Sequence, residues 1–282
     1  MRPKLYRSRN RGLTIIELVV VVAVLAILAG FIVPRLGFVR NLAAESGNAT
    51  IIADAASQAV FYNTAVGHYP QGEDSLLDTA NAVYANLNSS LKGALTSLDL
   101  STDNLAGKSL AAQLDPNGAS FVLYEGTAGG SPTSTPNTDF TNLETITYSS
   151  GAGAVGHVAQ VTPPVAADVT ANHVNYQIYK AAYGLSNLSA TTGAPLDGTY
   201  LIAVGYGANS QINGKTGLEA PLLFDKTPGE YTRPVLLLKV FGSTSAAVGV
   251  PQGTSATTSI SIGFDASTAN AQLAKYAVDQ NR

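Results

Sequence analysis

The first strong pattern along the chain is a long apolar run near the N-terminus. Residues 13–33 read LTIIELVVVVAVLAILAGFIV, and Glu17 is the only charged residue among them. About 20 such residues in a helix span the hydrocarbon core of a membrane. The run therefore predicts one membrane-spanning helix over residues 13–33.

Helical periodicity continues beyond this run. Between residues 35 and 66 apolar residues recur at helical spacing opposite polar ones, at Leu36, Val39, Ala43, Ala49, Ile52, Ala56 and Val60. Gly67 followed by Pro70 is a stop signal, which predicts one helix of roughly fifty residues whose soluble half, 34–68, packs on a head domain. Gly30 and Pro34 predict a kink or local melting at 30–34, and the alternative is a membrane helix that ends there.

Residues 69–282 are predicted to form this head. Apolar spacing at Leu76, Leu77, Ala80, Val83, Tyr84 and Leu87, and again at Leu105, Leu110 and Leu114, predicts short helices within 73–114. A β-rich part covers 119–265, with extended runs at 121–124, 143–148, 157–161, 200–204, 221–224, 235–241 and 260–264. Residues 269–280 are predicted to be a C-terminal helix. The expected fold class is α+β, a long helix packed on a mostly antiparallel sheet.

Composition supports a folded chain with a neutral surface. The 282 residues are 45% apolar and include 27 Gly and 13 Pro, which fits one domain with an appendage. Only 12% are charged, so Ser, Thr, Asn, Gly and Ala must cover much of the surface. Because there is no Cys, disulfides, thiolate catalysis and Cys-based metal sites are excluded.

Charge is distributed unevenly along the chain. Five basic residues precede the first acidic one, namely Arg2, Lys4, Arg7, Arg9 and Arg11. A basic cluster before an apolar span places the N-terminus in the cytoplasm. The remaining chain has 11 of the 16 basic residues against 19 acidic ones, which argues against a nucleic-acid partner. An ordinary signal peptide is the competing interpretation, but the apolar run is too long and no small-x-small cleavage site follows it.

The start of the apolar run resembles a known processing signal. Arg11-Gly12-Leu13-Thr14-Ile15-Ile16-Glu17 is similar to the signal of type IV prepilins and type II secretion pseudopilins. The resemblance implies a leader, 1–12, that a prepilin peptidase removes between Gly12 and Leu13, N-methylation of Leu13, and assembly of subunits through this helix. Leu13 departs from the Phe or Met commonest in the family, and Pro34 falls where many members have a proline.

Glu17 is the fifth residue of the expected mature chain. An ionisable group inside a membrane segment is costly and indicates a function, although a charge near the end of a span can also reach the headgroups. Cleavage would create an α-amino group on Leu13 that is charged at neutral pH. Glu17 can pair with it within one helix or between neighbouring subunits, and we expect the second pairing to set the axial register of assembly.

The resemblance also implies a cellular context. The precursor would be a single-pass protein of the bacterial inner membrane, and the mature chain part of a periplasmic or extracellular filament. Its partners would be identical and related pilin-like subunits, prepilin peptidase and the inner-membrane assembly machinery. Major pseudopilins bind calcium, so oxygen ligands could come from Asp225, Glu230 or Asp265, although their spacing matches no defined loop.

Patterns for catalysis are weak or absent, which predicts a protein that is not an enzyme. The segment 151–156 matches G-x-G-x-x-G but lacks the surrounding βαβ unit, and residues 213–216 are typical of a turn. His68, His157 and His173 show no metal-ligand spacing, and no cofactor is expected from the residues. A membrane-anchored enzyme and an adhesive module whose tyrosines stack on sugars are the alternatives.

Overall fold

The computed structural model describes residues 15–100, 120–130, 136–149, 153–217, 219–223, 229–241 and 259–262. The chain divides into two compact units, Met1–Ala44 and Glu45–Arg282. Helix α1, Ile15–Val66, is assigned as helix at every position, including Gly30 and Pro34. The prediction that the helix continues past residue 34 is confirmed, and local melting at 30–34 is not observed. Considering only the described residues, no helix has the length and hydropathy needed to cross a membrane.

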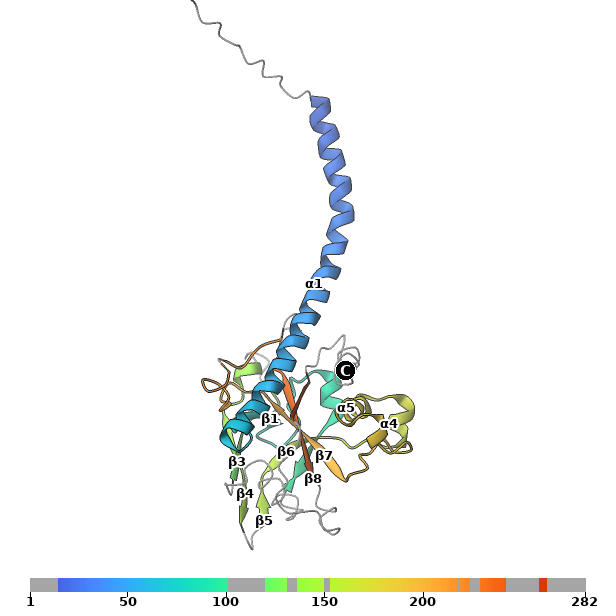
Figure 1. Cartoon of the computed structure of the whole chain (residues 1–282). Coiled ribbons are helices and arrows are strands. Elements are labelled where there is room, and N and C mark those ends of the chain that lie inside the picture. The colour runs from blue at the N-terminus through green and yellow to red at the C-terminus, as the bar shows by residue number, and fades with distance from the viewer. Residues whose placement is uncertain are drawn as a thin grey trace, which may run out of the picture. The chain divides into compact units, whose positions relative to one another are not determined.

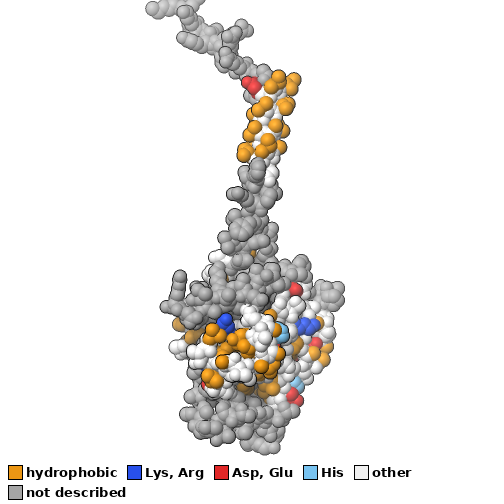
Figure 2. Space-filling model, turned by 90° about the vertical axis from the view of Figure 1, so that its right-hand side faces the viewer, with side chains coloured by type: hydrophobic (Ala, Val, Ile, Leu, Met, Phe, Trp, Pro, Cys, Tyr) orange, Lys and Arg blue, Asp and Glu red, His pale blue; other side chains and the backbone are white. Residues whose placement is uncertain are grey.

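In the first unit, α1 exposes apolar side chains on all sides. The large apolar side chains of this stretch are 47% to 82% exposed. They lie at positions 15, 16, 18–22, 24, 25, 27 and 28. Figure 2 shows hydrophobic side chains along the visible face of this stretch. Large, contiguous apolar surface of this kind marks a site that lipid or another protein covers.

In the second unit, the last part of α1 packs on the head through one face. Its buried residues are spaced by four and three positions, at Asn48, Ile52, Ala55, Ala59 and Tyr62. This spacing places them on one side of a helix, as expected for packing on a sheet. The helix then ends at Gly67, which has a φ of 89° and whose N–H donates to the carbonyl oxygen of Asn63 at 2.8 Å. A positive φ favours glycine, so the predicted stop signal is confirmed.

The head contains a nine-stranded sheet. The strands are β1 Glu73–Asp78, β2 Leu95–Asp99, β3 Ser120–Gly126, β4 Asn142–Ser149, β5 Gly153–Val155, β6 His157–Val161, β7 Thr199–Gly205, β8 Val235–Phe241 and β9 Ser259–Ile262. Their order is β2-β6-β7-β1-β3-β4-β5, and β8 also pairs with β7 and β9. Only the β1–β3 pair is parallel among the described strands, so the prediction of a mostly antiparallel sheet is confirmed.

Helices cover both faces of this sheet (Figure 1). The short helices are α2 Ser89–Ala94, α4 Ala166–Ala171 and α5 Val174–Tyr183, with 3-10 turns η2 Pro136–Thr138 and η3 Leu185–Asn187. Side chains alternate along β7, the central strand, which is buried throughout. Ile202 and Val204 join the core that contains Tyr62 of α1, whereas Leu201 and Ala203 join the core that contains the helix α5. The α+β class is therefore confirmed.

The prediction of two or three short helices within 73–114 is partly wrong. Residues 73–78 and 95–99 are strands, and only Ser89–Ala94 is helical among the described residues of this stretch. The helix-like apolar spacing has a different origin, because β1 leads into a tight turn in which Asp78 accepts N–H donors from Ala80 and Ala82. The turn returns Tyr84 to the carbonyl oxygen of Leu76, so apolar residues from both sides of the turn enter one core.

The β-rich part also differs from the prediction in places. Six of the seven expected runs contain strands, but residues 221–223 have no regular structure, and helices α4 and α5 lie between β6 and β7. Residues 153–155, within the G-x-G-x-x-G match, form strand β5, which pairs with β4. Residues 101–119 and 242–258 and the expected helix 269–280 lie outside the described residues.

Candidate functional site

The N-terminal candidates occupy the first unit. Gly12 and Leu13, the predicted cleavage residues, lie outside the described residues. Glu17 is exposed in the first turn of α1, and Pro34 lies within the helical part of the same unit. The processing site and the roles of Glu17 and Pro34 in assembly therefore stay predictions.

A loop of the head, 206–217, holds the last turns of α1. The hydroxyl of Tyr62 donates to Gln211 Oε1 at 2.7 Å, and Lys215 Nζ donates to the Tyr62 oxygen at 3.3 Å. The Tyr206 hydroxyl donates to Gln58 Oε1 at 3.0 Å. These bonds join segments about 150 residues apart in the sequence, and they hold the C-terminal part of α1 on the head.

The same loop is bound on its inner side to two buried carboxylates of β1. Glu73 is fully buried and accepts the N–H of Gly207 at 3.0 Å and the hydroxyl of Ser210 at 2.5 Å. Asp74 is 1% exposed and accepts the hydroxyl of Tyr231 at 2.8 Å. One end of the loop therefore depends on acidic groups in the core.

Burial controls the charge of these groups. Loss of water raises the pKa of Glu73 to about 8 and that of Asp74 to about 7. The positive charge of Arg233 opposes both shifts, and Arg233 is itself buried. The carboxylates of Glu73 and Asp74 and the guanidinium of Arg233 have a total charge of zero when one proton is bound to the two carboxylates. We therefore expect Glu73 and Asp74 to titrate as a coupled pair.

A second group of acids lies where β1, β3 and β4 meet. Burial, followed by repulsion from Glu144 and Asp78, raises the pKa of Glu125 to about 7. The carboxylate of Asp78 is occupied by backbone N–H donors, including that of Gly129. Within the part of the chain that the structure describes, no three His, Asp or Glu side chains are placed to hold a metal ion.

Of the three carboxylates considered for calcium, the structure describes only Glu230. Asp225 and Asp265 lie outside the described residues, and Glu230 is a half-buried residue after a turn. Calcium binding therefore stays an expectation that only the resemblance supports.

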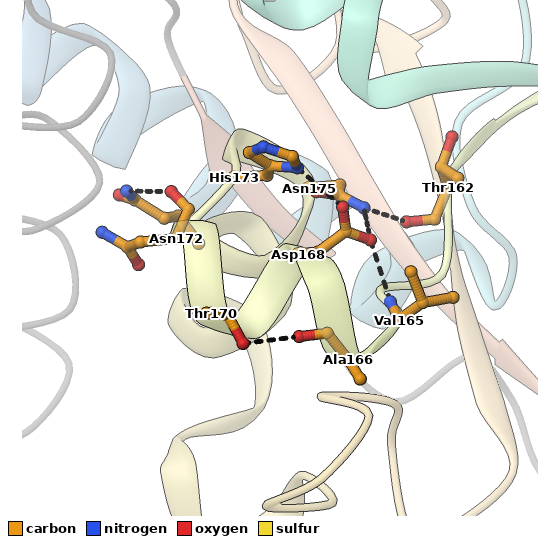
Figure 3. A network of polar contacts seen from close by, with 9 residues as sticks. Thr162, Val165, Ala166, Asp168, Thr170, Asn172, His173 and Asn175 are labelled. Carbon is orange, nitrogen blue, oxygen red and sulfur yellow. Dashed lines mark hydrogen bonds and ion pairs between the residues drawn. The ribbon is translucent and has the colours of Figure 1, made fainter.

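A groove of about 520 Å³ lies between α2 and the corner that joins α4 to α5. Asp168 is one of its lining residues and is hydrogen-bonded to three groups of the protein (Figure 3). The backbone N–H of Val165 donates to Oδ2 at 2.8 Å, and Nδ2 of Asn175 donates to the same oxygen at 3.0 Å. Nδ1 of His173 lies 2.7 Å from Oδ1, so it must carry the proton. These bonds hold the pKa of Asp168 below its usual range.

The local sequence explains this corner. Asn172 ends α4 with a φ of 53°, a left-handed conformation that Asn tolerates better than most residues. The N–H of His173 then donates to the carbonyl oxygen of Asp168, and α5 begins at the next residue. The sequence analysis missed this site because it did not predict α4 and α5. One local signal could have revealed this corner. Asn172 is a residue that often ends a helix, and it lies between the carboxylate of Asp168 and the imidazole of His173 in the sequence.

Comparison with known proteins informs only the N-terminal segment. No curated protein and no solved structure matches the chain. Residues 7–33 match the family described as the prokaryotic N-terminal methylation motif, which confirms the resemblance found in the sequence. Through these residues the chain carries the hallmark of type IV pilin and pseudopilin precursors.

Proposed function

We propose that this chain is a structural subunit of a type IV pilin-like filament, either a type IV pilus or a type II secretion pseudopilus. The observation that carries the proposal is the methylation motif over residues 7–33. The apolar side chains that α1 exposes between Ile15 and Leu28 support it, because such a surface needs lipid or other helices around it.

Before assembly, the precursor is stored in the bacterial inner membrane. Residues 13–33 form the membrane segment, and the basic leader, 1–12, stays in the cytoplasm. Prepilin peptidase cuts between Gly12 and Leu13, and the new N-terminus is methylated. The assembly machinery of the inner membrane then moves subunits from the lipid into the filament.

In the filament, subunits stack through the N-terminal part of α1. A head-to-tail interface that does not close into a ring generates a helical fibre. The carboxylate of Glu17 pairs with the Leu13 α-amino group of a neighbour, and this buried ion pair selects the axial register. The head takes no part in catalysis and lies toward the outside.

The first experiment is an intact-mass and N-terminal sequencing measurement on the protein from its native host. A mature chain that begins at methylated Leu13 supports the proposal. A chain that keeps Met1, or one cut beyond Val33, contradicts it.

The second experiment separates processing from assembly. Glu17→Ala and the isosteric Glu17→Gln are compared with the wild type for cleavage and for the yield of sheared filaments. We expect cleaved subunits but at least a tenfold loss of filaments in both variants, because neither can form the ion pair. Undiminished filaments in both variants would refute the role of Glu17 and leave the processing result standing.

Immunogold labelling of whole cells then distinguishes the two kinds of filament. Labelled fibres on the cell surface indicate a pilus, which the sparsely charged head favours. Labelling confined to the periplasm indicates a pseudopilus.

A further inference from the structure

The groove between α2 and the α4–α5 corner is not used by the proposed filament function. It is lined by the hydroxyls of Ser89, Ser90 and Thr162 and by the side chains of Asn172, His173 and Asn175. Its volume of about 520 Å³ lies within the range of small-molecule sites, about 300–1,000 Å³. Three separate segments of the chain supply these groups, so the fold alone creates their juxtaposition.

The charge of the lining excludes two classes of ligand. No Lys or Arg is among the lining residues, and any positive charge on His173 is paired with Asp168 at 2.7 Å, so an anion would find no unpaired opposite charge there. The one carboxylate, Asp168, already accepts hydrogen bonds from Val165, Asn175 and His173. A cation would have to displace these protein donors, so the groove suits a neutral ligand.

The lining also indicates the shape of that ligand. Hydroxyl and amide side chains can each donate and accept, which matches the double hydrogen-bonding capacity of alcohol groups. The lining has more apolar than polar surface, and its apolar residues are Gly93, Ala94 and Val174. It offers no deep pocket for a peptide side chain, which peptide-binding grooves use for specificity. A flat ring with C–H groups on one face and hydroxyls at its edge fits both parts of the lining.

His173 is oriented in advance for such a contact. Its Nδ1 is held by Asp168 at 2.7 Å, so Nε2 is the ring nitrogen left to bond a ligand hydroxyl. The side chain is 57% exposed and belongs to the lining (Figure 3). A side chain that is already held in place loses little conformational freedom when a ligand binds.

We propose that this groove binds a neutral saccharide unit, with His173 Nε2 and the Ser90 hydroxyl among the groups that bond its hydroxyls. The proposal concerns the head alone and does not depend on filament assembly. Single exposed grooves of this kind bind weakly, so we expect dissociation constants in the millimolar range.

Histidine resonances provide a direct test, because the chain has only three histidines. The full chain is labelled with ¹³C-histidine and kept in a detergent without a sugar headgroup. Cellobiose, lactose and N,N′-diacetylchitobiose are titrated to millimolar concentrations, and inorganic phosphate and trialanine are titrated as probes of the other ligand classes. We expect at least one disaccharide to shift the His173 signal in a saturable way, while the His68 signal stays unchanged.

Variants establish that the groove is responsible. His173→Gln and Ser90→Ala should each weaken the disaccharide about three- to tenfold, as expected for the loss of one hydrogen bond. His157→Gln is the matched control, because His157 lies on β6 outside the lining, and its affinity should equal that of the wild type.

Two results would overturn the proposal. One is that none of the three disaccharides shifts the His173 signal, or that only phosphate or trialanine does. The other is that a disaccharide binds with equal affinity to the wild type and to both groove variants. Near-ultraviolet circular dichroism confirms that each variant is folded before it is compared.

Discussion

The buried pair Glu73 and Asp74 makes the stability of the head depend on pH. The pKa of Glu73 is about 8 in the folded chain, against an ordinary value of 4.5. Between these two pH values the folded state binds more protons than the unfolded state, so the free energy of unfolding falls as pH rises. The stabilisation from Glu73 is greatest below about pH 4.5, where this carboxyl is protonated in both states, and it is lost above about pH 8.

The size of the effect follows from proton linkage. One proton changes the folding equilibrium by up to tenfold per pH unit, which amounts to about 5 kcal/mol over the whole window. Glu73→Gln removes that proton but keeps an oxygen to accept the N–H of Gly207. We therefore expect unfolding of the variant to release about one proton fewer than unfolding of the wild type, so that its free energy of unfolding depends less on pH. At pH 9 the variant should be more stable than the wild type.

The assay is urea denaturation of the full chain in detergent at several values between about pH 5 and 9. Unfolding is followed by tyrosine circular dichroism, since the chain has 13 Tyr and no Trp. Glu219→Gln is the matched control, because Glu219 is exposed, and its slope should equal that of the wild type. Because the pair is coupled, Asp74→Asn is measured as well. Identical slopes in the wild type, Glu73→Gln and Asp74→Asn would refute the reasoning.

Two further predictions concern the contacts between the loop 206–217 and the C-terminal part of α1. A Cβ at Gly217 would displace the end of the Gln58 side chain, which accepts the Tyr206 hydroxyl, so Gly217→Ala should lower the free energy of unfolding by about 0.5–1.5 kcal/mol in the same assay, the usual contribution of one hydrogen bond. Gly93→Ala is its control, because a Cβ at Gly93 of α2 meets nothing within 4 Å, and it should leave stability unchanged or raise it by up to about 1 kcal/mol. Tyr62→Phe removes the hydroxyl that donates to Gln211, and an unchanged unfolding midpoint would contradict the expected loss of about 1 kcal/mol.

Helices and strands were predictable where their side-chain pattern is local and regular. The end of α1 was found from the sequence, because Gly67 with Pro70 marks it. The buried face was not, because Ile52 is the only buried residue among the predicted apolar positions that the structure describes, and Val60 is 46% exposed. Strand β8 was found because it is an apolar run interrupted by Lys239 alone, typical of a strand buried in a sheet.

Strand β1 was not predictable in the same way. It carries Glu73, Asp74 and Asp78, polar residues that normally lie on a surface, yet all six of its residues are buried. The partners that make this burial tolerable, Ser210 and Tyr231, are more than 130 residues away. The helix-like spacing of the neighbouring leucines was therefore the only local signal, and it indicated the wrong element.

By itself, the sequence determined the N-terminal motif, the apolar segment 13–33 and the long helix, because each depends on residues close together along the chain. Only the tertiary structure decided which carboxylates are buried, how the loop 206–217 holds Tyr62, and that Ser90, Thr162 and His173 line one groove. The physical reason is that these arrangements depend on pairing between distant segments, and no local periodicity records which segments will meet.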